Sequence, residues 1–326
     1  MRFIAAFLIY VLSQLTYAYS NEYGHNHLML LGHELLKQCG YSSIAHQYSV
    51  NDINTVVNGS TSVDYSVSPF SRYNRLFDWH FYKADQDSST GLKKSRALFA
   101  DRTFVDPWES LHNDYPNELN RTERLLLLGG YAHFIEDMAN PAHVIPVFHM
   151  IGIKDGIDDF PSKYYQKPLN TVKFDDDICA RFHEFDERVA KTKDKPNMKG
   201  KTNIIDTILH QAVRTTNQEL TRVIPHCPSL TWNAFYTVSS SDEFWGGFYQ
   251  QPVKTIKRYK NKRRANHTFK EKVVIGHEGV IHFSSNMECA FVKSSYQPFV
   301  DRLFENAIIY DAALLKHQVH RFAEES

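Results

Sequence analysis

The chain has 326 residues, in which 37 lysines and arginines balance 37 aspartates and glutamates. A net charge of zero and a hydrophobic content of 42% exclude a general polyanion binder, a disordered chain and a protein with many membrane spans. The 17 histidines exceed ordinary usage, and because histidine is the commonest metal ligand, metal binding is the first function to examine.

The amino terminus has the pattern of a secretory signal peptide. Arg2 precedes an apolar run over residues 3–12, and small residues stand at Thr16 and Ala18, the positions that a signal peptidase reads. A retained membrane anchor is the weaker interpretation, because a spanning helix needs about 20 apolar residues. We therefore expect a signal peptide at residues 1–18, cleavage after Ala18, and a secreted or periplasmic protein.

Four cysteines remain in the expected mature chain, at positions 39, 179, 227 and 289. An oxidising compartment allows them to form up to two disulfides, in three possible connectivities. None belongs to a Cys-x-x-Cys pair, so a thiolate zinc site is not expected.

Helical periodicity dominates the first two thirds of the chain and returns near its end. The spacing of apolar residues predicts helices over residues 27–38, 122–140, 202–224 and 298–322. Aromatic and β-branched residues replace this pattern between residues 232 and 296, where residues 273–275 and 280–283 are typical of a hairpin. We expect one mainly α domain over residues 19–326 with a small β-rich C-terminal insertion at about 232–296.

The residues with the clearest chemical meaning lie at the end of the second predicted helix. His133 and Asp137 are four residues apart, so they share one helix face and can share a cation. Pro141 ends the helix, which allows His143 to turn back toward the same place. A lone His-x3-Asp pair is more often a surface hydrogen bond, but this combination favours a metal site.

The run His133-x3-Asp137-x3-Pro141-x-His143 resembles the signature of the bacterial, phosphatidylcholine-hydrolysing zinc-dependent phospholipases C. That family shares its helical fold and three-zinc centre with the fungal single-strand-specific nucleases. The resemblance covers about residues 19–189 and implies a set of zinc ligands: Tyr19, His27, Asp64, His80, His133, Asp137, His143, His183 and Glu187. It also implies that Asp64 is the base that activates the attacking water.

Three features depart from the family pattern. Tyr19 stands where the family has a tryptophan, and the separation of Asp64 and His80 is longer than in the family. The closing pair, His183 and Glu187, also follows His143 at a longer distance than usual. We prefer this pair because zinc binds nitrogen readily. The alternative ligands for the same place are His149, Asp155 and Asp159.

The resemblance also implies a substrate. Glu22, Tyr65 and Phe77 stand where the phosphatidylcholine-cleaving enzymes form their headgroup pocket, and a carboxylate with two aromatic faces suits a quaternary ammonium. We therefore expect a zinc phospholipase C that hydrolyses phosphatidylcholine to diacylglycerol and phosphocholine at a membrane surface, with no stable protein partner.

Two other functions remain open. A single-strand nuclease would use the same zinc centre, the aromatic segment 232–249 for base stacking, and the basic residues between 254 and 264 for the phosphate backbone. A solvated loop is the more common interpretation of that basic run, and contact with an anionic lipid surface is a further alternative to nucleic acid. The third possibility is an exported zinc-containing binding protein without catalytic activity.

Overall fold

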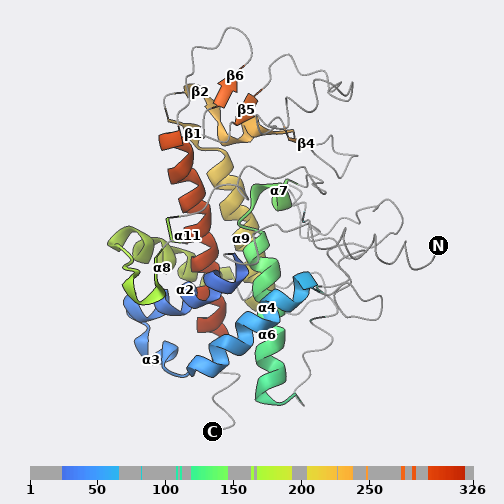
Figure 1. The fold of residues 1–326 in the computed structure, drawn as a ribbon, viewed down its shortest axis with the longest axis vertical. Coiled ribbons are helices and arrows are strands. Elements are labelled where there is room, and N and C mark those ends of the chain that lie inside the picture. Colours follow the sequence, from blue (N-terminus) through green and yellow to red (C-terminus); the bar gives the residue numbers. More distant parts are fainter. Residues whose placement is uncertain are drawn as a thin grey trace, which may run out of the picture.

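The computed structural model describes the helical body of the chain and short pieces of the remainder (Figure 1). The described residues are 24–65, 82, 108, 111, 119–145, 163–164, 167–192, 204–225, 227–237, 247–248, 273–275, 281–283 and 293–319. The expected signal peptide at residues 1–18 and the basic run between 254 and 264 lie outside them.

The described part of the chain is mainly helical, as the sequence predicts. Its α-helices are α2 (His25–Gln38), α3 (Ser42–Ala45), α4 (Val50–Tyr65), α6 (Arg121–Asp137), α7 (Pro141–Val144), α8 (Asp176–Thr192), α9 (Ile204–Leu220) and α11 (Lys293–Gln318). Two short 3-10 turns, η1 (Leu169–Thr171) and η2 (Trp232–Phe235), complete the helical elements. In these described residues, no helix is long and apolar enough to cross a membrane.

Helix α11 is the central element of the core. Figure 1 shows it as the long red helix along the vertical axis, and it packs against α2, α6, α8 and α9. It begins at Lys293, before the predicted start at Pro298. The proline removes one helical N–H group, and the burial of Phe299, Val300 and Leu303 directly after it offsets that loss.

Helix α6 carries the predicted metal-binding motif, and local sequence fixes both of its ends. At its start, the Asn120 side chain accepts a hydrogen bond from the Glu123 amide at 3.0 Å, and the Glu123 carboxylate accepts one from the Asn120 amide at 3.0 Å. This reciprocal pair is a capping box. The helix ends at Asp137, followed by a turn and by Pro141 at the start of α7. The predicted end at residue 140 was therefore three residues too late.

Helices α4 and α6 lie unusually close together because each helix places a glycine against the backbone of the other. A Cβ at Gly59 would overlap the carbonyl oxygen of Leu126, and one at Gly129 would overlap that of Val56. A similar contact joins α2 and α11, where a Cβ at Gly32 would lie 2.6 Å from the Cβ of Asp311. These glycines let polar side chains from four helices meet in the interior.

The described strands form three antiparallel pairs after α9. They are β1 (Val223–Ile224) with β2 (Cys227–Thr231), β3 (Tyr236–Thr237) with β4 (Gly247–Phe248), and β5 (Val273–Ile275) with β6 (Ile281–Phe283). Pairing of Val274 with His282 sets the register of β5 and β6 at the predicted hairpin. Helix α9 ends at Leu220, earlier than predicted, because β1 takes up the following residues. Most of the expected insertion at 232–296 lies outside the described residues.

A disulfide joins Cys39, directly after α2, to Cys179 in α8, with their Cα atoms 5.3 Å apart. This bond selects one of the three connectivities that the sequence allows. The side chains of Cys227 and Cys289 are outside the described set. The bond therefore ties α8 to the end of α2, although the two cysteines are 140 residues apart in sequence.

Candidate metal site

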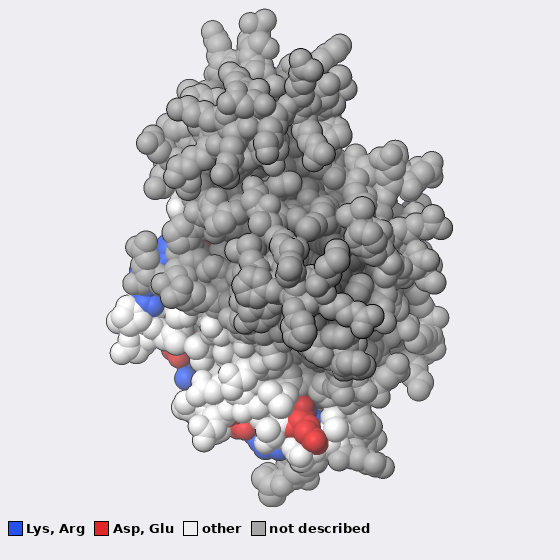
Figure 2. Space-filling view, turned by 45° about the vertical axis from the view of Figure 1, so that its right-hand side comes forward, with Lys and Arg blue, Asp and Glu red and all other residues white. Residues whose placement is uncertain are grey.

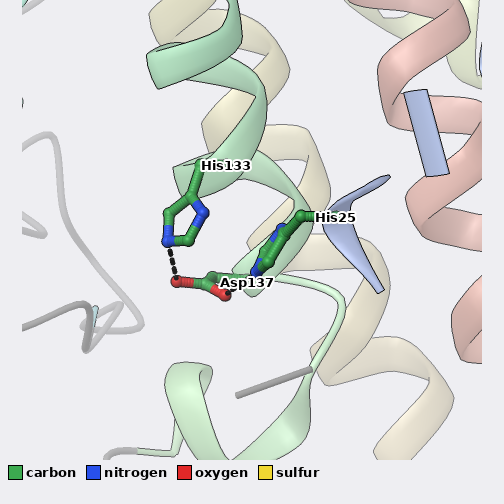
Figure 3. A group of neighbouring side chains, drawn as sticks. All are labelled: His25, His133 and Asp137. Carbon is green, nitrogen blue, oxygen red and sulfur yellow. Dashed lines mark ion pairs between the residues drawn. The ribbon is translucent and has the colours of Figure 1, made fainter. Parts of the chain in front are cut away.

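Three side chains that can ligate a metal meet in the interior between α2 and α6. They are His25, at the start of α2, and His133 and Asp137, in the last turns of α6. Their candidate ligand atoms all lie within 4.8 Å of one another, and none of the three side chains is exposed to solvent. Figure 3 shows the carboxylate of Asp137 facing both imidazoles. One buried group in this chain can therefore bind a metal ion.

The distances within this group suit coordination better than hydrogen bonding. Asp137 Oδ1 lies 3.6 Å from His25 Nε2, and Asp137 Oδ2 lies 3.5 Å from His133 Nε2. Ordinary N–H···O hydrogen bonds are about 2.7–3.2 Å long. Two ligand atoms that each lie about 2.1 Å from a tetrahedral ion are about 3.4 Å apart. The two imidazole rings stack with their centroids 4.0 Å apart, which holds both nitrogens on the same side.

His143 of α7 also lies close to the Asp137 carboxylate. Its Nδ1 lies 3.7 Å from Asp137 Oδ2, and its side chain is buried. The proline at the start of α7 therefore has the predicted effect, since the chain turns and brings His143 back to Asp137. The carbonyl oxygen of His143 accepts a hydrogen bond from the Tyr82 amide at 2.8 Å. Tyr82 is two residues beyond His80, which itself lies outside the described residues.

The structure brings His25 to this group in place of His27, the early histidine that the sequence favoured. Side chains two positions apart on a helix point in directions that differ by about 200°, so His25 and His27 cannot both face the same ion. His27 is partly buried, its Nε2 has no hydrogen-bond partner among the described residues, and burial lowers its pKa. Both histidines flank Asn26, and the sequence alone does not reveal which of them faces α6.

The expected closing pair is not part of the buried group. His183 and Glu187 are exposed on α8, which α11 separates from α6 in Figure 1. His183 Nδ1 lies 3.4 Å from the Tyr41 hydroxyl, and Glu187 pairs with Lys191 at 3.0 Å. The His-x3-Glu spacing puts two side chains on one face of a helix but does not determine that the face is buried. The face of α8 that is buried carries Phe182, Phe185 and Val189.

The other expected site residues fall outside what the structure describes. Asp64 and Tyr65 are the last two residues of α4, and their side chains are not described. The remaining positions lie outside the described ranges: Tyr19, Glu22, Phe77, His80, His149, Asp155 and Asp159. The expected site is therefore represented by His133, Asp137 and His143, together with the unexpected His25.

A second layer of acidic groups backs the site. Glu136 is fully buried and hydrogen-bonds to His25 Nδ1, and Ser60 of α4 donates to Glu136 Oε2 at 3.2 Å. Asp311 of α11 is also fully buried, and burial together with the nearby charge of Glu136 raises its pKa well above the usual range. Burial and the neighbouring carboxylate therefore both disfavour the charged form of Asp311. These residues come from three separate helices, so no local sequence pattern marks them.

Imidazole nitrogen and carboxylate oxygen are the donors that zinc takes most readily in proteins besides thiolate sulfur. The group lies below the surface, and on the face drawn in Figure 2 the described acidic and basic residues are interspersed, without a patch of one sign.

No protein-family model, no curated protein and no solved structure matches this chain. Its function must therefore be inferred from the site itself.

Proposed function

We propose that the chain is a secreted zinc-dependent phospholipase C that hydrolyses phosphatidylcholine to diacylglycerol and phosphocholine. The observation that carries this proposal is the buried group of His25, His133 and Asp137, with His143 beside it. Two or three imidazole nitrogens and one carboxylate oxygen are ligands that suit zinc. When bound, zinc lowers the pKa of a coordinated water toward neutrality and neutralises negative charge on phosphate oxygens.

The roles of the protein's own residues follow from their positions. Asp137 is the central ligand, since its two oxygens face different histidines. Asp64 is the proposed base, which accepts the proton of the attacking water. One helical turn before it in α4, Ser60 donates its hydrogen bond to Glu136, the residue next to Asp137. This contact supports a place for the end of α4 beside the metal site.

The full centre in this proposal holds three zinc ions. Besides the described ligands, Tyr19, Asp64 and His80 are the proposed further ones. The anchoring of Tyr82 to the carbonyl of His143 supports the placement of His80, because two residues of extended chain reach only about 7 Å. The second site is completed by His149, Asp155 or Asp159 in this proposal, since His183 and Glu187 face solvent.

Glu22, Tyr65 and Phe77 are the proposed choline-binding residues. Tyr65 directly follows Asp64 at the end of α4, so the proposed headgroup pocket adjoins the proposed base. Cation–π attraction contributes about 0.5–2 kcal/mol, so Tyr65→Ala should slow phosphatidylcholine hydrolysis about tenfold. A small soluble phosphodiester without choline should be hydrolysed at an unchanged rate. Equal losses on both substrates would remove Tyr65 from headgroup recognition.

The test of the proposed function uses the mature chain that starts at Tyr19, with phosphatidylcholine vesicles as substrate. We expect release of phosphocholine that a chelator abolishes and added zinc restores. Asp137→Asn should be inactive while remaining folded by circular dichroism. Single-stranded DNA and RNA are the competing substrates. Cleavage of nucleic acid alone would assign the chain as a nuclease, and zinc binding without hydrolysis of either substrate would assign it as a binding protein.

A secreted location belongs to the same proposal. The disulfide between Cys39 and Cys179 supports it, because such bonds persist in oxidising compartments. Mass spectrometry of the mature protein recovered from the cell exterior or periplasm should give a first residue of Tyr19. A protein that keeps its first 18 residues would contradict this assignment.

A further inference from the structure

The two ring nitrogens of His25 face two different carboxylates. Nδ1 is hydrogen-bonded to Glu136 Oε2, whereas Nε2 lies toward Asp137, 3.6 Å from its Oδ1. Glu136 and Asp137 are consecutive residues, so the last turn of α6 supplies both partners. Figure 3 shows the His25 ring directed toward Asp137. The metal-facing nitrogen and the nitrogen that contacts Glu136 are therefore on opposite sides of one ring.

We propose that Glu136 is a positioning residue that selects the metal-binding tautomer of His25. A carboxylate accepts hydrogen bonds, so it places the proton of a neutral imidazole on Nδ1 and leaves the lone pair on Nε2. Metal-binding histidines commonly donate their other N–H group to a carboxylate in this way. This inference rests on the proposed metal site, and it assigns to Glu136 a role that the ligand motif does not include.

Contacts from three helices hold Glu136 in place. Its side chain is fully buried, and Ser60 of α4 donates to the same oxygen that contacts His25. Asp311 of α11 lies close to Glu136. Gly32 permits this approach, because it stands seven residues after His25 on α2 and a Cβ there would lie 2.6 Å from the Asp311 Cβ. Glu136 is thus fixed before any metal binds.

The first test measures zinc affinity of the full chain by competition with a chromogenic chelator. Glu136→Gln keeps the size of the side chain but can both donate to and accept from His25. Loss of such an outer-layer partner typically weakens metal binding about 10–100-fold, and we expect a loss in that range. The matched control is Glu219→Gln, which also alters a buried glutamate but one whose ion pair is with Arg302 of α11. Its zinc affinity should be unchanged.

The second test separates positioning from a merely structural role. Nitrogen-15 NMR of the metal-free, histidine-labelled protein reports which nitrogen of His25 carries the proton, and His25→Gln assigns the resonance. We expect a proton on Nδ1 in the wild-type chain and a mixture of tautomers in Glu136→Gln. A proton on Nε2 in the wild type, or unchanged tautomer and zinc affinity in the folded variant, would overturn the inference.

The two proposals fail in different ways. If the wild-type chain does not bind zinc, the proposed function is wrong, but the NMR measurement on metal-free protein still decides whether Glu136 fixes the tautomer of His25. If zinc binds normally in the folded Glu136→Gln protein, the metal site stands and only the positioning role of Glu136 is lost.

Discussion

Gly129 of α6 lies so close to Ser60 of α4 that a Cβ on the glycine would sit 2.5 Å from the Ser60 amide nitrogen. Real Cβ atoms essentially never come within 3 Å of another heavy atom in this way. Ser60 in turn donates its side-chain hydrogen bond to Glu136, the residue beside Asp137 of the candidate metal site. The crossing of these two helices therefore determines the geometry behind the site as well as the packing of the core.

We predict that Gly129→Ala destabilises the protein by about 1–3 kcal/mol. The added methyl group would overlap the backbone of α4, so helices α4 and α6 would have to move apart. Urea unfolding monitored by circular dichroism measures this change. The control is Leu126→Ala on the same helix, where the side chain is 40% exposed and the expected change is within about 0.5 kcal/mol. A Gly129→Ala protein as stable as the wild type would show that α4 and α6 do not cross at this distance.

The disulfide between Cys39 and Cys179 should contribute substantially to stability. Closing a loop of 140 residues restricts the unfolded chain, and removal of a native disulfide costs about 2–5 kcal/mol. The double variant Cys39→Ser, Cys179→Ser should therefore unfold at lower urea concentration. Peptide mapping under non-reducing conditions checks the connectivity. A Cys39 peptide linked to Cys227 or Cys289 would contradict it.

Much of the helical framework can be predicted from the sequence, because the four helices predicted from apolar spacing overlap α2, α6, α9 and α11, whereas bounds for α4 and α8 were not predicted. Helix α6 has local signals at both ends instead of one apolar stripe, since Asn120 with Glu123 caps its start, Pro141 begins the next helix, and nearly every residue from Leu125 to Asp137 is buried. Single residues at the ends are harder to place. Helix α11 begins before Pro298, because tertiary burial outweighs the cost of one missing backbone donor.

The site could be predicted only in part, for a similar reason. His133, Asp137 and His143 lie within one short segment, so local spacing alone brings them together. The choice between His25 and His27 depends on how α2 is rotated against α6, which no local pattern specifies. Glu136 and Asp311 meet only because of the packing of separate helices.

Acid should weaken the contacts between α11 and residues 163–181. Burial alone would raise the pKa of Glu305, but the hydrogen bond from Lys163 and the charge of Arg181 outweigh burial and lower that pKa. A lowered folded-state pKa means that the stabilisation is fully present above the ordinary value of about 4.3 and is lost as the pH falls through the folded-state value. Stability should therefore decline below about pH 4.

The variant Glu305→Gln isolates this contribution. It removes charged hydrogen bonds to Lys163, at 2.7 Å, and to Arg181, so we expect a loss of about 1.5–3 kcal/mol at pH 7. The difference in unfolding free energy between wild type and variant should shrink as the pH is lowered through the folded-state pKa, because Glu305 then becomes protonated. A difference that does not depend on pH would show that Glu305 is not charged in the folded protein.

The contrast between His133 and His183 tests the metal site most directly. His133 is fully buried beside Asp137, whereas His183 faces solvent near Tyr41. Loss of a residue that supports a metal ligand typically weakens metal binding by up to about 100-fold. Loss of a direct ligand should weaken zinc binding further, so the His133→Ala protein should not retain zinc in the presence of a chelator. His183→Ala should retain the zinc content of the wild type, measured by elemental analysis after dialysis. Loss of zinc in His183→Ala would bring α8 into the metal centre after all, and retention of zinc in both variants would remove His133 from it.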